Sequence, residues 1–182
     1  MIDAFSLPVI LLCSILYGIT MKIADLLDEH GLKYFKGSDL LFGIFWGIFG
    51  ALLVLSNDII ANIILAMNIA FLIRRRIDYL NHAIAISIII ITFLFYSLIN
   101  VTVFLVFYLI FLIFGGLKDY ADDFLKKRKG LFFTLNESML YYPIPTFVYS
   151  LIYGNWIVFF VFLFYTVFYD LTKYYYKKHG YK

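Results

Sequence analysis

Long apolar stretches interrupted by short polar breaks dominate the chain. Residues 40–73 contain one charged side chain, Asp58, and residues 83–117 contain none. A single helix over residues 83–117 would reach about 52 Å, well beyond the roughly 30 Å of hydrocarbon in a bilayer. Each stretch therefore predicts a hairpin of two helices that turns at the polar break near its middle. The breaks are Ser56 to Asp58 in the first stretch and Ser97 to Asn100 in the second.

The same pattern predicts seven membrane-spanning helices. Residues 131–169 are divided at Gly154 and Asn155, and residues 5–21 form a first apolar segment. The first four residues carry no basic group, which favours a membrane helix over a cleaved signal peptide. Apolar spans are expected to be helices, because backbone polar groups in lipid must be satisfied internally. The expected spans are residues 5–21, 39–55, 59–74, 83–98, 101–117, 134–152 and 156–172.

The amino-acid composition excludes the soluble classes of protein. Of the 182 residues, 64% are apolar and 15% are charged, and the mean hydropathy is +0.91. A soluble domain is nearer to half apolar and a quarter charged, because its surface must meet water. The sequence thus predicts one all-α, multi-pass integral membrane domain over residues 1–182, in the cell membrane. The single cysteine, Cys13, lies in an apolar run and forms no intrachain disulfide.

The positions of the charges predict the orientation of the chain. All fifteen Lys and Arg residues follow the first, third, fifth or seventh expected span, so they fall on one face of the membrane. Short cytoplasmic loops carry such an excess of basic residues. We therefore expect the N-terminus outside the cell and the C-terminus in the cytoplasm. Topology explains the basic loops in this way, and the sequence gives no further indication of nucleic-acid binding.

Small, rigid and polar residues inside the spans predict local packing. Gly43, Gly47 and Gly50 allow helix backbones to approach closely. Pro143 and Pro145 fall within the expected span 134–152 and predict a kink or break there. The amides of two further residues predict hydrogen bonds between helices. These residues are Asn62 and Asn68.

Two acidic clusters lie at the cytoplasmic ends of the first and fifth expected spans. They are Asp25, Asp28 and Glu29, and Asp119, Asp122 and Asp123. Spacings of three and four residues place each set on one helix face, and the two spans run in the same direction. Because Mg²⁺ prefers hard oxygen ligands together with phosphates, the clusters predict a magnesium and phosphate site. An alternative interpretation pairs Lys22 with Asp25 and Lys118 with Asp122 as helix-end salt bridges.

Motif and layout together resemble the UbiA superfamily of intramembrane prenyltransferases. Asp25 to Asp28 resembles the first aspartate-rich motif of that family. Lys118 to Asp123, followed by Lys127 to Gly130 and Thr134, is similar to the second motif with its basic tail. Four helices separate the two motifs here, as in the family, and the Arg74 to Arg76 turn falls at one of its cytoplasmic loops. The chain departs from the family in having seven expected helices instead of nine. It also has Ala24, Leu32 and Lys126 at positions where family motifs usually carry Asn or an acid.

The resemblance implies Mg²⁺-dependent transfer of a prenyl group from a prenyl diphosphate to a lipophilic acceptor at the cytoplasmic side of the bilayer. The chain would then be a transferase of alkyl groups other than methyl. The implied Mg²⁺ ligands are Asp25, Asp28, Asp119 and Asp122, with Glu29 and Asp123 as further candidates. The implied diphosphate contacts are Lys33, Lys36 and Lys129. Aromatic side chains would line a prenyl channel.

The sequence leaves a non-catalytic role open. A small transporter or an assembly subunit with a partner would use the acidic clusters only as interfacial charge. Transporter sites usually lie near the bilayer midplane, whereas the charge here gathers at one face. CDP-alcohol phosphotransferases require a DxxDGxxAR motif and intramembrane aspartyl proteases a GxGD segment, and the sequence has neither. Glu137 is a further candidate if it lies at membrane depth, and an interfacial charge if the sixth span begins after it. No His or Cys spacing, including that of His30 and His82, predicts a zinc site.

Overall fold

Seven helices make up the part of the chain that the computed structural model describes, residues 5–124 and 138–180. No β-strand occurs among these residues, so the predicted all-α class is confirmed for them. The helices are α1 (Leu7–Glu29), α2 (Ser38–Ser56), α3 (Asp58–Ile73), α4 (Leu80–Tyr96), α5 (Val101–Phe124), α7 (Pro143–Tyr153) and α8 (Trp156–Lys178).

Four of the described helices are long enough and apolar enough to cross a bilayer. They are Leu7–Glu29, Ser38–Ser56, Val101–Ala121 and Trp156–Lys178. The helices Asp58–Ile73 and Leu80–Tyr96 are apolar but shorter. Length and composition therefore agree that this is a membrane protein.

The three polar breaks separate consecutive helices, as the sequence predicted. The Asn57 side chain accepts hydrogen bonds from the backbone N–H groups of Ile59 and Ile60, so it caps the start of α3. Asn100 caps α5 by accepting from Val103 N–H at 3.1 Å. Gly154 ends α7 with φ +72, a left-handed conformation that glycine adopts readily.

The prolines mark where α7 begins and do not kink a continuous helix. Residues 138–142 form a turn in which Met139 has φ +50, and Pro143 is the first residue of α7. A proline suits that position, because the first helical residue needs no N–H group for the helix ladder. The described part of the expected span 134–152 is therefore a turn followed by a helix.

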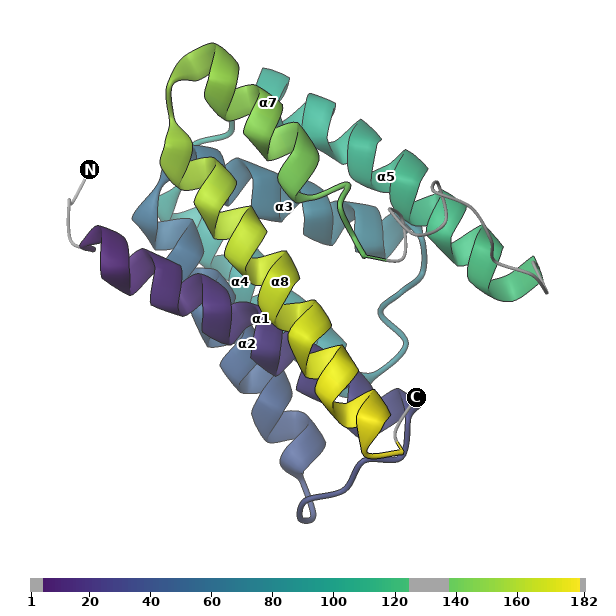
Figure 1. Ribbon diagram of the computed structural model, residues 1–182. Coiled ribbons are helices and arrows are strands. Elements are labelled where there is room, and N and C mark those ends of the chain that lie inside the picture. The colour runs from purple at the N-terminus through teal and green to yellow at the C-terminus, as the bar shows by residue number, and fades with distance from the viewer. Residues whose placement is uncertain (1–4, 125–137, 181–182) are drawn as a thin grey trace.

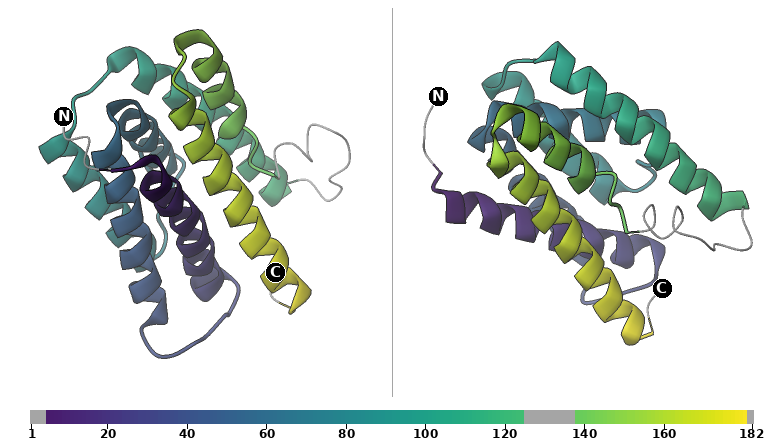
Figure 2. Two further views of the ribbon diagram at one scale, coloured as in Figure 1. Left: turned by 60° about the vertical axis from the view of Figure 1, so that its left-hand side comes forward. Right: turned by 45° about the horizontal axis from the view of Figure 1, so that its top comes forward.

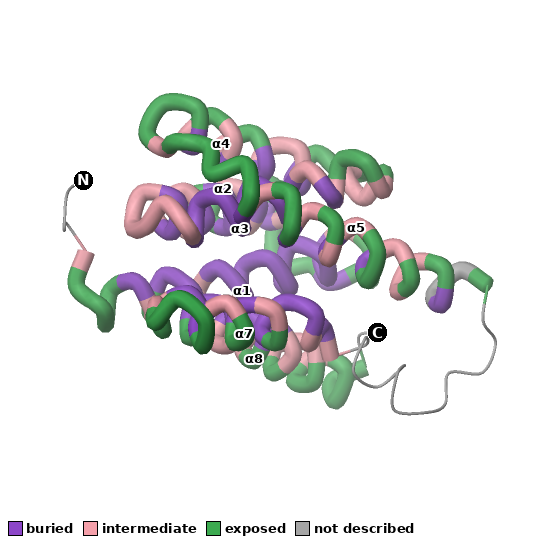
Figure 3. Tube along the Cα trace, turned by 90° about the horizontal axis from the view of Figure 1, so that it is seen from above, coloured by how far each residue is buried: buried purple, intermediate pink, exposed green. Residues whose placement is uncertain are grey.

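Contacts link all seven described helices, and α3 joins α2 and α4 to α5. α1 packs against both α2 and α8, and α2 packs against α4. α3 packs against α5, and α7 and α8 form an antiparallel pair (Figures 1 and 2). α3 is the most enclosed helix, with every residue from Ile60 to Asn68 buried. Much of α5 is exposed, and Figure 3 shows the buried positions gathered on the inner faces of the helices.

Glycines allow the closest helix approaches. A Cβ atom at Gly43 would lie 2.7 Å from Asn81 on α4, and one at Gly47 would lie 3.0 Å from Ala85. Gly50 faces Ile89 at similarly short range. The predicted close approach along this glycine row is therefore confirmed, and its partner is α4.

A buried amide fastens the turn between α4 and α5. Asn62 on α3 donates to the Leu98 carbonyl at 2.9 Å and accepts from the Asn100 N–H at 2.8 Å. Asn62 thus joins α3 to the turn between α4 and α5, whereas the sequence predicted a bond from helix to helix. Asn68 Nδ2 donates instead to the Ile64 carbonyl within α3.

Candidate functional site

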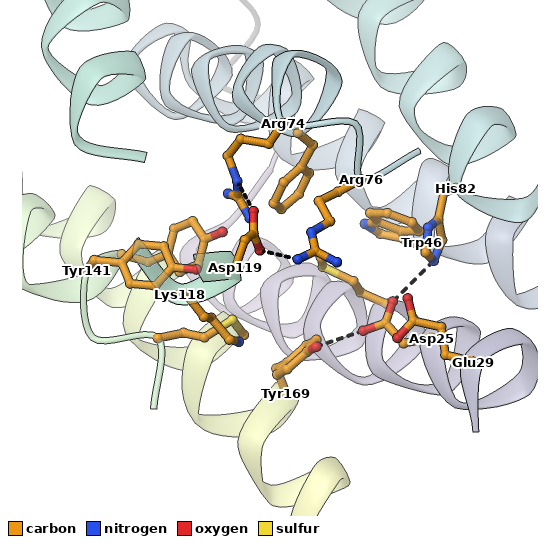
Figure 4. A pocket seen from close by; sticks show the side chains of 14 residues that line it. Asp25, Glu29, Trp46, Arg74, Arg76, His82, Lys118, Asp119, Tyr141 and Tyr169 are labelled. Carbon is orange, nitrogen blue, oxygen red and sulfur yellow. Dashed lines mark hydrogen bonds and ion pairs between the residues drawn. The ribbon is translucent and has the colours of Figure 1, made fainter. Parts of the chain in front are cut away.

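Both acidic clusters contribute to one cavity of about 160 Å³. The cavity lies where α1, α3 and α5 end and where α4 begins, and α8 supplies one wall (Figure 4). Six charged side chains line it: Asp25, Glu29, Arg74, Arg76, Lys118 and Asp119. Three acids and three bases thus share a small space, together with His82 and several aromatic rings.

Asp25 is the centre of one charged group in this cavity. Its Oδ2 accepts a hydrogen bond of 2.7 Å from the Tyr169 hydroxyl, and its Oδ1 lies 3.2 Å from His82 Nε2. Lys22 Nζ lies 3.6 Å from Oδ2 and 5.2 Å from the centre of the Tyr169 ring. The pair of Lys22 and Asp25 proposed from sequence is therefore present, but both residues are buried and not solvated.

Two contacts of α4 bring His82 to Asp25. Asn81 Nδ2 donates to the Ala24 carbonyl at 3.1 Å, which fixes the start of α4 beside α1. Gly43 on α2 leaves the space that Asn81 fills. The glycine row therefore does more than pack helices, because it positions an imidazole next to the first acidic cluster.

Asp119 is the centre of a second charged group. Arg74 donates to both carboxylate oxygens, from Nε at 2.7 Å and from Nη2 at 3.0 Å, and Arg76 Nη2 lies 2.9 Å from Oδ1. Gly115 lies one helical turn before Asp119, and a Cβ atom there would collide with the Arg74 guanidinium. Burial disfavours the Arg74 charge, but the hydrogen bonds to Asp119 outweigh it and raise the Arg74 pKa above its ordinary value. The Arg74 side chain therefore stays charged.

The structure separates the other predicted site residues. Asp28, Lys33 and Lys36 line a different surface hollow of about 510 Å³, together with Asp39, so the structure does not bring them to the charged cavity. Glu29 lies on the same face of α1 as Asp25 and is exposed at the cavity rim.

Four residues predicted from the sequence lie wholly, or with their side chains, outside the part of the chain that the structure describes. Asp122 and Asp123 occupy the last turn of α5, and their side chains lie outside the described part of the chain. Lys129 and Glu137 lie outside the described residues altogether.

Sequence reasoning missed most of the basic and aromatic lining of the cavity. Arg74 and Arg76 belong to the basic triplet at residues 74–76. Membrane topology explained that triplet without requiring a binding site. Arg75 between them is exposed and has φ +57, so the backbone turns sharply there. His82 and Tyr169 gave no signal, because they lie far from Asp25 in the sequence and only helix packing brings them close.

The carboxylates fit Mg²⁺ only together with an anionic ligand. Among the described residues no group of three or more His, Cys, Asp or Glu side chains forms a ready metal site. Asp25 and Glu29 face the cavity from one helix, and Asp119 faces it from another. Carboxylate oxygens accept more than one interaction each, so their ion pairs leave room for a metal contact. Mg²⁺ commonly takes one or two carboxylates and completes its shell with phosphates and water, which this donor set matches.

No family model, curated protein or solved structure matches this chain. The assignment of a function therefore depends on the residues and on the geometry of the cavity.

Proposed function

We propose that this protein transfers a prenyl group from a prenyl diphosphate to a lipophilic acceptor, in a Mg²⁺-dependent reaction. One observation supports this best: Asp25 and Asp119, from two clusters that four helices would separate in a prenyltransferase of the UbiA type, line a single cavity. That cavity also contains three cationic side chains, which a diphosphate requires.

The proposed topology has the seven spans expected from the sequence, with the N-terminus outside and the C-terminus in the cytoplasm of the cell, and the 11-residue α7 makes up only part of the sixth span. The ends of α1, α3 and α5 then lie on the cytoplasmic face, because each is followed by basic residues. The cavity among these ends is within reach of a water-soluble head group and of a lipophilic acceptor in the membrane.

The cavity's own residues supply charge for the leaving group. Guanidinium groups match phosphate oxygens with two parallel donors, and Arg76, whose side chain is 38% exposed, is the more accessible of the two arginines. Lys118 adds a third cation from α5. Bound Mg²⁺ would offset the charge that develops as the allylic carbon–oxygen bond breaks, and Asp25, Glu29 and Asp119 would hold it.

Aromatic side chains complete the site. Trp46, Phe71, Tyr141 and Tyr142 line the cavity beside the charged groups. Their ring faces attract positive charge, and their bulk excludes water from an allylic centre that water would otherwise capture. The sequence predicted aromatic side chains around the prenyl group without specifying which ones, and the lining of the cavity identifies these four rings as the candidates.

A structural role is the second candidate, and the ion pairs favour it. Both oxygens of Asp119 and both oxygens of Asp25 already have protein partners. These contacts join α3 to α5 and join α1 to α4 and α8, so they would hold the bundle together without any ligand. Binding measurements separate this role from the enzymatic one.

The test is binding of geranylgeranyl diphosphate to the detergent-purified protein, with and without Mg²⁺. We compare the wild type with Asp25→Asn, Asp119→Asn and Arg76→Ala. The expected result is micromolar binding that needs Mg²⁺ and weakens about tenfold or more in each variant, a change of about 1.4 kcal/mol. Release of diphosphate on addition of candidate acceptors then identifies the second substrate.

Asp58→Asn is the matched control, because it removes one carboxylate at the first residue of α3, the opposite end of that helix from the cavity. Its affinity should equal that of the wild type. Circular dichroism and size-exclusion chromatography show whether each variant is folded. Folded wild-type protein that binds no prenyl diphosphate, or variants that all bind equally, would leave the structural role as the correct one.

A further inference from the structure

A second hollow, which we call the α1–α2 hollow, lies where the chain passes from α1 to α2. Its volume is about 510 Å³, within the range of roughly 300–1,000 Å³ typical of small-molecule sites. It shares no lining residue with the charged cavity. Four charged side chains line it: Asp28, Lys33, Lys36 and Asp39.

The α1–α2 hollow lies beside the segment that joins two helices able to span a membrane. α1 and α2 follow one another, and both are long enough and apolar enough to cross a bilayer. If both cross it, the joining segment lies at the head-group level of one leaflet, whichever orientation the chain has. Tyr34 and Phe35 of this segment are 45% and 58% exposed. Exposed aromatic side chains beside a span are typical of that level.

Contacts with two helices hold the joining segment in place. The hydroxyl groups of Tyr34 and Tyr176 are hydrogen-bonded to each other, which ties the segment to the C-terminal part of α8 (Figure 1). The centre of the Tyr34 ring also lies 5.8 Å from that of Phe42 on α2. Leu32 is buried in a small apolar cluster with Leu26 and Leu27 of α1. The hollow is therefore a formed site.

The four charged side chains of the hollow form no ion pair with one another or with any other described residue. The carboxylates of Asp28 and Asp39 lie close enough to repel each other. A cationic group between them would remove that repulsion. Lys33 and Lys36 are free in the same way to contact an anionic group. The lining thus suits a ligand that carries one charge of each sign.

Ser38 adds a buried polar group to the same lining. It is the first residue of α2, is 3% exposed and lines the hollow. Its hydroxyl has no hydrogen-bond partner among the described residues, although buried polar groups normally have one. The first backbone N–H groups of a helix also lack helical acceptors and carry partial positive charge. A phosphate oxygen would satisfy the hydroxyl and suit the start of α2.

An apolar helix face continues from the hollow. Leu40, Ile44 and Ile48 are four residues apart, so they share one face of α2, and the first of them directly follows Asp39. Leu40 and Ile48 are exposed. Acyl chains attached to a bound head group would pack on this face, which favours a membrane lipid over a soluble phosphate ester as the ligand.

We infer that the α1–α2 hollow binds the head group of a membrane phospholipid that carries a phosphate and a primary ammonium, as phosphatidylethanolamine does. Lys33, Lys36 and the Ser38 hydroxyl contact the phosphate. Asp28 and Asp39 accept charge-assisted hydrogen bonds from the ammonium. This inference does not depend on prenyl transfer. It gives the two lysines a ligand other than the diphosphate that the sequence resemblance implied.

Lipid titrations of the detergent-purified protein, read by native mass spectrometry, test the inference. The probes are dioleoyl phosphatidylethanolamine, phosphatidylcholine and phosphatidylglycerol. Phosphatidylcholine keeps the positive charge but has no N–H group to donate, and phosphatidylglycerol has no ammonium. The wild type should bind one phosphatidylethanolamine about tenfold or more tightly than either other lipid, because charge-assisted hydrogen bonds are strong.

A double lysine variant tests the phosphate contacts. Lys33→Gln combined with Lys36→Gln should weaken phosphatidylethanolamine binding about tenfold or more. The matched control combines Lys177→Gln with Lys178→Gln, which removes two exposed lysines that do not line the hollow. The control should keep the wild-type affinity. All four lysines are exposed, so neither variant disturbs the core, and circular dichroism checks the fold.

A double acid variant tests the ammonium contacts. Asp28→Asn combined with Asp39→Asn should abolish the preference for phosphatidylethanolamine over phosphatidylcholine. The matched control combines Asp58→Asn with Asp78→Asn, which removes two carboxylates that do not line the hollow. The control should keep the preference.

Three results would overturn the inference. Equal affinities of the folded wild type for the three lipids would mean that the hollow does not recognise the head group. Equal effects of the hollow variants and their controls would place lipid binding elsewhere. Displacement of phosphatidylethanolamine by an equal concentration of glycerophosphoethanolamine, which lacks acyl chains, would make the ligand a soluble phosphate ester.

Binding of geranylgeranyl diphosphate to the double lysine variant separates this inference from the proposed function. The variant of Lys33 and Lys36 should bind geranylgeranyl diphosphate as the wild type does, because neither lysine lines the charged cavity. Loss of that binding would return both lysines to the diphosphate and overturn their assignment to a lipid.

Discussion

Removing the Arg74 side chain should weaken the contact between α3 and α5, and the loss of stability can be estimated from the structure. Arg74 donates two charge-assisted hydrogen bonds to Asp119, at 2.7 and 3.0 Å. The Arg74 side chain is 9% exposed and that of Asp119 is 20% exposed, so water screens the pair only weakly. Breaking a buried pair by removing one partner costs about 3–5 kcal/mol. Because Arg76 still contacts Asp119, we expect Arg74→Ala to lower the free energy of unfolding by about 3 kcal/mol.

A double-mutant cycle isolates the contribution of the pair. The variants are Arg74→Ala, Asp119→Asn and the combination of the two, each unfolded by denaturant titration in mild detergent. We expect a coupling energy of about 2 kcal/mol, because charge-assisted hydrogen bonds contribute roughly 1.5–3 kcal/mol and Arg76 recovers part of the loss. Arg75→Ala is the control from the same basic triplet. Arg75 is exposed, so its removal should change stability by less than about 0.5 kcal/mol.

Two results would refute this reasoning. Equal effects of Arg74→Ala and Arg75→Ala would mean that the buried guanidinium adds nothing beyond an exposed one. A coupling energy near zero would mean that Arg74 stabilises the fold through contacts other than Asp119, such as its approach to the Phe71 ring at 5.5 Å.

Two further predictions concern helix packing and topology. Gly18→Ala should lower the free energy of unfolding by about 1–3 kcal/mol in a denaturant titration, because its Cβ would collide with the Tyr165 backbone on α8. Gly116→Ala meets open space and should raise the free energy of unfolding by up to about 1 kcal/mol. Equal effects of the two substitutions would contradict the packing. Because Cys13 is buried, an introduced cysteine can report topology in intact cells. Ser97→Cys should react with a membrane-impermeant maleimide and Lys33→Cys should not, and the reverse pattern would contradict the proposed orientation.

The parts of the fold that depend on local chemistry could be predicted from the sequence. Asn57, Asn100 and Gly154 end or begin helices through their own side chain or backbone conformation, so the polar breaks were recognisable without tertiary structure. The glycine row on α2 was recognisable for the same reason, since only glycine permits so close an approach. Its partner was not, because spacing on one helix does not identify the helix that faces it.

Part of the acidic set of the candidate site could be predicted, and the rest of the site could not. Spacings within α1 and α5 predicted shared helix faces, and Asp25, Glu29 and Asp119 do line one cavity, but Asp28 lines a different hollow. Their distance from Lys33 and Lys36 depends on where the loop after α1 lies, which no periodicity determines. His82 and Tyr169 reach Asp25 only because the start of α4 is fixed beside α1 and α8 packs against α1 (Figure 4).

The two arginines of the cavity have different environments, and this difference reconciles the structural and enzymatic candidates. Arg74 is almost fully buried, holds both oxygens of Asp119 and fills the space above Gly115, so releasing it would leave a buried carboxylate with one partner fewer. The Arg76 side chain is 38% exposed, and its Nη2 lies 2.9 Å from the same carboxylate. A diphosphate that replaces Asp119 as the partner of Arg76 therefore leaves Arg74 paired with Asp119, and the contact between α3 and α5 stays intact. If this exchange occurs, Arg76→Ala should weaken diphosphate binding with little effect on stability, and Arg74→Ala should lower the stability of the fold first.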